Sequence, residues 1–425
     1  MSTPTSTRAS GTATPRPSAG PAHPVFTGMG VAAPNGLGRD RWWRATLAGE
    51  SGIRPVSRFD ARGYPAQLAG EVPGFDAAEH IPGRLLPQTD HMTRLALTAA
   101  DEAIADSGLD PRSEPEFASG VVTAASAGGF EFGQRELESL WGKGSRHVSA
   151  YQSFAWFYAV NTGQISIRHG LRGPSGVIVS EQAGGLDAVA QARRQLRKGS
   201  RRIVTGGVDG AICPWGWAAL LAGGHMSTAS DPVRAFLPFD AAACGQVAGE
   251  GGAILVLEDA ATARDRGARS YGALAGYAAT FDPRPGSGGE PGLRRAAEGA
   301  LADAGLTADA VDVVFADAAG VPELDRAEAE AICALFGPRG VSVSVPKTMT
   351  GRLAAGGGSL DLAAALLALR DGVIPPSVHI TGDGLPEHLA LDLVTATPRE
   401  MPLRTALVLA RGQGGFNAAT VVTAP

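Results

Sequence analysis

Cysteine is scarce in this chain, whose 425 residues include only Cys213, Cys244 and Cys333. Three cysteines that lie far apart exclude a disulfide framework, and their spacing fits no metal site. We therefore expect each of them to be buried as a small apolar side chain, in a protein of the reducing cytoplasm.

Long apolar runs and an excess of positive charge are also lacking. No apolar run reaches the ~20 residues that a membrane-spanning helix needs, so no membrane association is predicted. The net charge is −5, which gives no indication of nucleic acid as a partner. Residues 1–23 are rich in Ser, Thr, Pro and Ala. Because they have no apolar centre, they are predicted to form a disordered tail and not a signal peptide.

Two α/β halves are predicted, over residues 24–270 and 271–425. Residues 42–86, rich in Pro and Gly, are expected to form a long surface excursion. In the first half we expect strands at residues 25–31, 121–123, 177–179, 202–208 and 253–257, and helices at 92–104, from 130 onward and at 182–198. In the second half we expect strands at residues 311–316, 342–345, 406–410 and 419–422, and helices at 292–304, 325–336 and 359–370.

The order of strand, glycine-bearing loop and apolar helix occurs twice, at residues 177–198 and 343–370. The second of these helices is apolar almost all round, which predicts burial on every side. Two repeated α/β halves whose central helices pack between two sheets form a five-layer αβαβα arrangement.

The most informative stretch is SEQAGGLD, residues 180–187, between the buried strand predicted at 177–179 and the following helix. A strand-to-helix turn of this kind aims a side chain and several backbone N–H groups into a pocket, where enzymes often place a nucleophile. The pocket position is assigned here to Gln182, and glutamine is not a nucleophile.

These features resemble the thiolase fold of the β-ketoacyl synthases, over roughly residues 24–425. In that family a nucleophilic cysteine, in a pattern like T-A-C-S-x-x-L-x-A, stands where this chain has Gln182. A first histidine opens the segment H-G-T-G-T-P-x-x-D, which here is DAAGVPELD and begins with Asp317. A second histidine ends K-S-x-x-G-H, which here is KTMTGR and ends with Arg352. The gate loop G-F-G-G is GQGG, with Gln413 in place of the phenylalanine.

The resemblance implies that the condensing chemistry is lost. Gln182 cannot form the thioester that the cysteine forms. The charge of Asp317 opposes the enolate that the histidines stabilise, and Arg352 is a permanent cation suited to binding an anion or to pairing with Asp317. The two threonines that hold the phosphopantetheine arm are replaced by Ala319 and Val321. All these changes together, with YQSFAWFY at residues 151–158, resemble the chain length factors, the silent subunits of type II aromatic polyketide synthases.

Such a subunit pairs with a ketosynthase alpha subunit, and the growing poly-β-ketone enters a tunnel along their interface. The resemblance implies no bound cofactor, because an acyl carrier protein delivers the substrates on its phosphopantetheine arm. It places the helical face with Phe130, Gly133 and Leu137 at the tunnel end, although these residues could equally be ordinary core. Since Gly133 removes a side chain and Leu137 is smaller than an aromatic, we expect a relatively long product, with Phe130 as the main part of the floor.

Three other functions remain open. Gln182 could support decarboxylation of malonyl groups to make primer, although the absence of both histidines opposes this. Cys213 or Cys244 could be the nucleophile of a condensing enzyme, although neither is expected to open a helix. The chain could also be a scaffold without a tunnel. Separately, the basic residues between Arg193 and Arg202 could attract an acidic carrier protein or simply be a solvated helix end.

Overall fold

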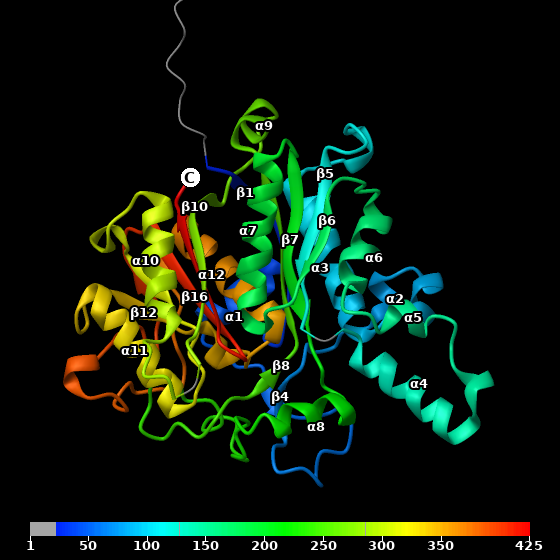
Figure 1. The fold of residues 1–425 in the computed structure, drawn as a ribbon, viewed down its shortest axis with the longest axis horizontal. Helices are drawn as coiled ribbons and strands as arrows, with labels where there is room; N and C mark the ends of the chain where they lie inside the picture. Colours follow the sequence, from blue (N-terminus) through cyan, green and yellow to red (C-terminus); the bar gives the residue numbers. More distant parts are fainter. Residues whose placement is uncertain (1–22, 127, 285) are drawn as a thin grey trace, which may run out of the picture.

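The computed structural model describes residues 23–425 apart from residues 127 and 285, so the predicted tail lies outside the described residues except for His23. Two α/β halves are visible in Figure 1. The strands of the first half are β1 (Val25–Ala33), β2 (Gly36–Leu37), β3 (Ile53–Pro55), β4 (Leu68–Gly70), β5 (Ser119–Ala124), β6 (Ser175–Ile178), β7 (Arg202–Asp209), β8 (Ala248–Gly249) and β9 (Gly251–Glu258). Its helices are α1 (Arg39–Leu47), α2 (Ala77–His80), α3 (His91–Ser107), α4 (Phe130–Lys143), α5 (Gln152–Ala155), α6 (Val160–His169), α7 (Gly184–Arg197), α8 (Pro214–Ala222) and α9 (Ala260–Asp265).

The second half repeats the first with fewer insertions. Its strands are β10 (Gly272–Phe281), β11 (Val313–Phe315), β12 (Ser342–Ser344), β13 (Val373–Ile374), β14 (Asp392–Leu393), β15 (Arg399–Glu400), β16 (Thr405–Gly412) and β17 (Phe416–Thr423). Its helices are α10 (Gly292–Ala304), α11 (Pro322–Phe336) and α12 (Gly357–Asp371). The exact boundary between the halves stays a prediction.

Strand order demonstrates the repeat. The first half runs β6-β5-β7-β9-β1 and the second runs β12-β11-β16-β17-β10, with β14 added at its outer edge. Numbered by their order along each half, both runs are 3-2-4-5-1. The two half-sheets form one continuous hydrogen-bonded sheet, because β1 pairs with β10 at Val25↔Ala273 and Phe26↔Gly272. The two predicted sheets are thus joined at one short antiparallel contact.

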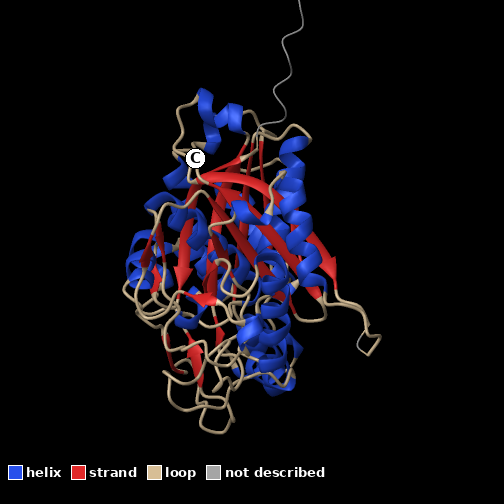
Figure 2. Cartoon of the chain, turned by 90° about the vertical axis from the view of Figure 1, so that its left-hand side faces the viewer, coloured by secondary structure: helices blue, strands red, loops and turns tan. Residues whose placement is uncertain are grey.

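The layers follow from the helices that cover each half-sheet. Helix α3 packs on β1, β9 and β7, and α10 packs on β10 and β17, so these two helices form outer layers. Helices α7 and α12 contact each other and lie between the half-sheets. Figure 2 shows the strands enclosed by helices on both sides. The predicted αβαβα order is confirmed.

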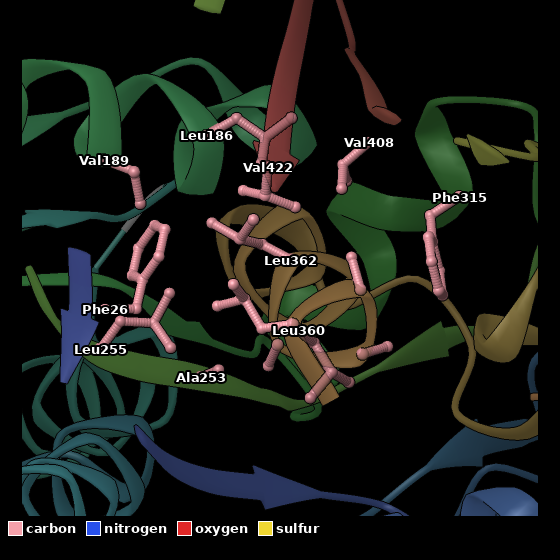
Figure 3. Packing of buried hydrophobic residues seen from close by; sticks show 14 of the residues in the cluster. Phe26, Leu186, Val189, Ala253, Leu255, Phe315, Leu360, Leu362, Val408 and Val422 are labelled. Carbon is pink, nitrogen blue, oxygen red and sulfur yellow. The ribbon is translucent and has the colours of Figure 1, made fainter. Parts of the chain in front are cut away.

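The core is centred on α12. Every residue of this helix from 357 to 369 is buried, as its continuous apolar sequence predicts. Leu360 and Leu362 belong to the same buried cluster as Leu186 of α7, Phe315 of β11 and Val408 of β16, and Leu362 lies next to Val422 (Figure 3). The loops that carry the candidate site therefore leave a rigid centre.

Three expectations about burial are wrong. The segment that begins at residue 42 is not wholly a surface excursion, because Trp42 and Trp43 of α1 are buried against the core. Strand β6 is not buried, since it lies at the sheet edge with Val179 next to it 48% exposed. Cys213 is buried as expected, but Cys244 is exposed and Cys333 is half-buried.

Membrane-spanning helices and metal clusters are both absent from the described part of the chain. No helix in residues 23–126, 128–284 or 286–425 is long and apolar enough to cross a membrane. Within the same ranges, no group of three or more His, Cys, Asp or Glu side chains is placed to hold a metal ion.

Candidate functional site

The turn before α7 positions Gln182 differently from the prediction. A short 3₁₀ turn, Glu181–Ala183, precedes α7, and Glu181 adopts a left-handed φ of 50°. The side chain of Gln182 is fully buried, and neither of its amide atoms has a hydrogen-bond partner in the described structure. It lies against Gly357, where a Cβ atom would come within 2.4 Å of the Gln182 Oε1 atom. Only glycine permits this approach.

A cavity of about 390 Å³ lies beside this turn. Glu181 lines it and Gln182 does not, so the assignment of Gln182 to the pocket is wrong. The other walls include Asp317 and Arg352 from the C-terminal half, together with Phe130 of α4. Gln413 also lines the cavity, and its backbone N–H donates to the Glu181 carboxylate at 3.0 Å. The gate loop is thereby tied to the turn that holds Gln182.

Asp317 and Arg352 lie together, as their family positions imply. The Arg352 guanidinium donates to the two carboxylate oxygens of Asp317 at 3.0 and 3.3 Å, and also to the Asp317 and Arg411 carbonyls. Burial opposes ionisation of Asp317, but the charges of Arg352 and Lys347 outweigh it and lower the pKa of the carboxyl group. The pair is a buried two-hydrogen-bond ion pair, and it offers no neutral imidazole for acid–base chemistry.

Two further carboxyl groups hold the Asp317 loop. Glu328 of α11 accepts hydrogen bonds from the backbone N–H groups of Asp317 and Ala318 at 2.7 and 2.8 Å. Asp325 accepts from the N–H groups of Gly320 and Phe239, both at 3.0 Å. Burial, with the nearby charge of Asp317, raises the pKa of Glu328 to about 7, and burial raises that of Asp325 to about 6.

Sequence reasoning missed Glu328. In the sequence, Glu328 resembles a charged residue on the solvated face of a helix. The only signal near it is the family segment at residues 317–325, which ends three residues before it. Its burial follows from the packing of α11 beneath the loop, with Glu328 1% exposed.

The apolar replacements of the arm threonines are also at this site. Ala319 lines the cavity and is buried, while Val321 immediately precedes α11. Neither side chain can donate or accept a hydrogen bond, so the groups that would hold a phosphopantetheine arm are missing from these two positions.

Neither cysteine is a nucleophile for the cavity. Contrary to expectation, Cys213 does open a helix, since it is the N-cap residue of α8. However, its side chain is buried, and burial raises the pKa of the thiol. Neither Cys213 nor the exposed Cys244 lines the described cavity. Cys213, with its raised thiol pKa and its place outside the cavity, is therefore not an activated nucleophile.

The predicted tunnel face lies on α4. The rings of Phe130 and Trp215 pack with centroids 4.7 Å apart, Gly133 is buried and Leu137 is 36% exposed. A Cβ atom at Gly133 would come 2.8 Å from Cδ1 of Trp156 and 3.0 Å from Cζ3 of Trp215. Gly133 removes a side chain as expected, but two indole rings fill the space beside it within this chain, and the long product stays a prediction. Trp215 was missed because it lies 82 residues away from Gly133.

An exposed aromatic surface surrounds this helix. Trp141 at the outer end of α4 is 83% exposed, and α4 projects from the body of the protein in Figure 1. Trp156, Phe157 and Tyr158, between α5 and α6, are each more than 40% exposed. Large apolar side chains that stay exposed on α4 and before α6, together with an open sheet edge at β6, are typical of surfaces that another protein covers.

The basic run from Arg193 to Arg202 is only partly free to dock a partner, because Arg194, Arg197, Lys198 and Arg201 are exposed whereas the first and last cations are buried. Arg193 is buried and pairs with Asp303 at 2.6 Å, and Arg202 is buried and pairs with Glu258 at 2.7 Å. Two of the cations that could attract an acidic carrier protein are thus engaged inside the fold.

Comparison with known proteins agrees with this geometry. Residues 24–263 match the Beta-ketoacyl synthase, N-terminal domain family, and residues 271–381 match the Beta-ketoacyl synthase, C-terminal domain family. The chain belongs to the β-ketoacyl synthase family. Two structures of β-ketoacyl synthases superimpose over 95% of this chain. "The ishigamide ketosynthase/chain length factor" has a TM-score of 0.83 at 27% identity over 99% of that chain. The complex "AntDE:AntF (apo): type II PKS acyl-carrier protein in complex with its ketosynthase bound to the hexaketide" has a TM-score of 0.84 at 25% identity over 100% of that chain.

Among β-ketoacyl synthases, this chain is more similar to a polyketide synthase beta subunit than to a 3-oxoacyl-carrier-protein synthase. The chain is 60% identical to the "Tetracenomycin polyketide synthase ketoacyl synthase beta subunit" of Streptomyces glaucescens, over 95% of this chain and 98% of that protein. It is only 32% identical to the "3-oxoacyl-[acyl-carrier-protein] synthase 2" of Coxiella burnetii, over 94% of this chain and 98% of that protein. The chain is a ketoacyl synthase beta subunit of the type II polyketide synthases, the group also called chain length factors, as the sequence indicated.

Proposed function

We propose that this chain is the non-condensing subunit of a ketosynthase heterodimer, and that its α4 face bounds the interface tunnel that sets the length of the poly-β-ketone. The observation that carries the proposal is the buried Asp317–Arg352 ion pair in the place of the family's two histidines. A subunit with this pair cannot stabilise an enolate as two imidazoles do, because the carboxylate repels the negative charge and holds the guanidinium.

The surroundings of Gln182 support the loss of condensation. Its amide is buried against Gly357 and lies outside the cavity that Glu181 lines. No acyl group can be transferred to a carboxamide, so elongation depends on a cysteine of another subunit.

The exposed aromatic surface supports a heterodimer. The exposed apolar side chains on α4 and before α6, among them Trp141 and Trp156, would be covered by a ketosynthase alpha subunit. The related ishigamide protein is a ketosynthase with a chain length factor, and the related Ant complex contains an acyl carrier protein. By analogy, an acyl carrier protein delivers the substrates of this heterodimer on its phosphopantetheine arm, and this chain holds no cofactor of its own.

The α4 face supports a role in chain length. It runs from Phe130, which lines the cavity, past Gly133 to the exposed Leu137, a distance of about 10 Å at 1.5 Å per residue. The tunnel would end where Phe130, Trp156 and Trp215 close this path. Elongation then stops when one more unit has to overpack these rings.

A Leu137→Trp variant tests this proposal. The heterodimer of the partner ketosynthase and this chain, given carrier protein and malonyl groups, should make a shorter poly-β-ketone with Leu137→Trp than with the wild type. A Cβ atom added at Gly163, on α6, would have no neighbouring atom within 4 Å, so Gly163→Ala serves as a control that changes a helix without reaching α4. An unchanged product length from an intact Leu137→Trp heterodimer contradicts the tunnel role.

The decarboxylase alternative is tested with Gln182. Its amide is buried outside the cavity and Asp317 is negative, so the geometry does not favour malonyl decarboxylation by this subunit. We expect the Gln182→Ala heterodimer to release CO₂ and to prime at the wild-type rate. A large loss of primer formation, with elongation of supplied primer unchanged, would restore the decarboxylase hypothesis.

A further inference from the structure

We propose that Asp90 is a positioning residue for polyketide length, because its buried carboxylate holds the start of α4 against the start of α3 and so sets the place of Phe130 and Gly133. The inference rests on the proposed function, because it assumes that the α4 face bounds the tunnel and that its position changes the length of the product. Asp90 itself does not line the cavity.

One carboxylate caps two helices. Asp90 is the N-cap residue of α3, and its Oδ1 accepts a hydrogen bond from the backbone N–H of Met92 at 2.9 Å. Its Oδ2 accepts from the backbone N–H of Phe132, in the first turn of α4, at 2.7 Å. The side chain is 2% exposed, so water does not compete for either bond. Two helices that lie about 40 residues apart in sequence therefore begin at the same group.

Helix α4 depends on this distant cap. Gly129 precedes its first residue and has no side chain with which to cap the helix. A Cβ atom at Gly129 would come 2.8 Å from the Cβ atom of Asp90 and 2.4 Å from the carbonyl oxygen of Ala155. The glycine thus permits the close approach that lets the Asp90 carboxylate reach the N–H of Phe132.

The electrostatics favour the same arrangement. The positive ends of the α3 and α4 dipoles converge on the Asp90 carboxylate. Burial raises the pKa of Asp90, and the hydrogen bonds from Phe132 and Met92 act in the opposite direction. The two N–H donors and the charge of His91 favour the ionised carboxylate and offset part of the rise in pKa, whereas the like charge of Glu131 adds to it.

The position of the cap links it to chain length. Phe132, the residue that donates to Asp90, lies between Phe130 and Gly133 on the first turn of α4. The rest of α4 extends away from the body (Figure 1), so its first turn is where the helix is fixed. A second tie, from the backbone N–H of Trp215 to the side-chain oxygen of Gln134 at 2.9 Å, joins the start of α8 to α4. Loss of the cap would let the floor of the tunnel move while the floor residues stay the same.

Asp90→Asn tests the inference in the reconstituted heterodimer. The asparagine keeps one acceptor, but its NH₂ group must face one of the two N–H donors. We expect one dominant product to become a mixture, with the ratio of the dominant product to its neighbours falling by roughly tenfold, the size that losing one charge-assisted hydrogen bond allows. Hydrogen exchange of the α4 peptide should become faster. Asp259→Asn is the matched control, because Asp259 caps only α9, at the opposite end of the protein in Figure 1.

Gly129→Ala gives a second test that keeps the carboxylate. The added methyl group pushes α4 away from Asp90 and should also broaden the product distribution. If both variants form wild-type amounts of heterodimer and keep the single dominant product, the positioning role is refuted. If Leu137→Trp shortens the product while Asp90→Asn and Gly129→Ala do not alter it, only this inference fails. If Leu137→Trp also has no effect, the proposed function fails with it.

Discussion

Replacing Gly133 with phenylalanine places a side chain where two indole rings already lie. Ordinary contact begins at 3.4 Å, so the Cβ atom alone is 0.6 Å too close to Trp156 (3.4 − 2.8) and 0.4 Å too close to Trp215 (3.4 − 3.0). Trp215 is held by Phe130 and by its bond to Gln134, whereas Trp156 is 44% exposed. The Trp156 ring is therefore expected to move outwards, towards its exposed side.

The magnitude follows from the cost of overpacking. Adding bulk to a packed site costs about 1–3 kcal/mol, which corresponds to a roughly 5- to 150-fold slower addition of the last units if the growing chain has to displace the same rings. We expect a shorter dominant product from the Gly133→Phe heterodimer, measured by mass spectrometry of the polyketides released in vitro. Gly142→Phe is the matched control, because Gly142 lies on the same helix with nothing within 4 Å of its Cβ position. An unchanged length with Gly133→Phe, or an equal shortening with Gly142→Phe, would refute the reasoning.

Three further predictions concern the degenerate site. Gln182→Leu removes two buried polar atoms that lack partners in the described structure, so we expect thermal unfolding at the same or a higher temperature, and a marked loss of stability would contradict the burial argument. Arg352→Met leaves the Asp317 carboxylate buried without its partner and should cost about 3–5 kcal/mol in denaturant unfolding, while a double variant that also replaces Asp317 with leucine should recover part of it. The folded-state pKa of Glu328, raised to about 7 from 4.5, means that the folded chain binds a proton more tightly than the unfolded chain, so this group's contribution to stability is full below about pH 4.5 and is lost as the pH rises towards 7. Glu328→Gln should flatten that part of the stability–pH curve, and an unchanged slope would assign the dependence to other groups.

Local sequence was sufficient to find the elements of the site. The glycine-bearing loops and the helix that starts at SEQAGGLD follow from patterns within about ten residues, and resemblance to the family's motifs pointed to Asp317 and Arg352. Their pairing was foreseen as one of two roles for Arg352, because opposite charges at neighbouring family positions favour an ion pair. The repetition of strand, loop and helix in the two halves was also visible in the sequence, whereas the order of the strands within each half-sheet was known only from the structure.

Side-chain direction and distant contacts could not be predicted in the same way. Gln182 turns away from the cavity because Glu181 takes a left-handed φ and because Gly357, 175 residues later, leaves room for the amide. The space at Gly133 is filled by Trp215, which follows Cys213 on a helix that no local pattern connects to α4. Both features depend on which segments the fold brings together.

Edge position explains the error about residues 177–179. An apolar run of this length predicts a buried strand, and the same run serves an edge strand when a second protein covers it. Strand β6 lies at the sheet edge and Val179, which follows it, is half-exposed, so this run has that character. The exposed apolar surface is thus a signal of partnership that could be found only once the edge was known.

Co-purification of the tagged chain from its native host, followed by native mass spectrometry, tests the central claim most directly. We predict an equimolar complex with a ketosynthase of similar size that has an intact cysteine and two histidines in the positions of Gln182, Asp317 and Arg352. A stable homodimer of this chain that contains no such partner would contradict the claim.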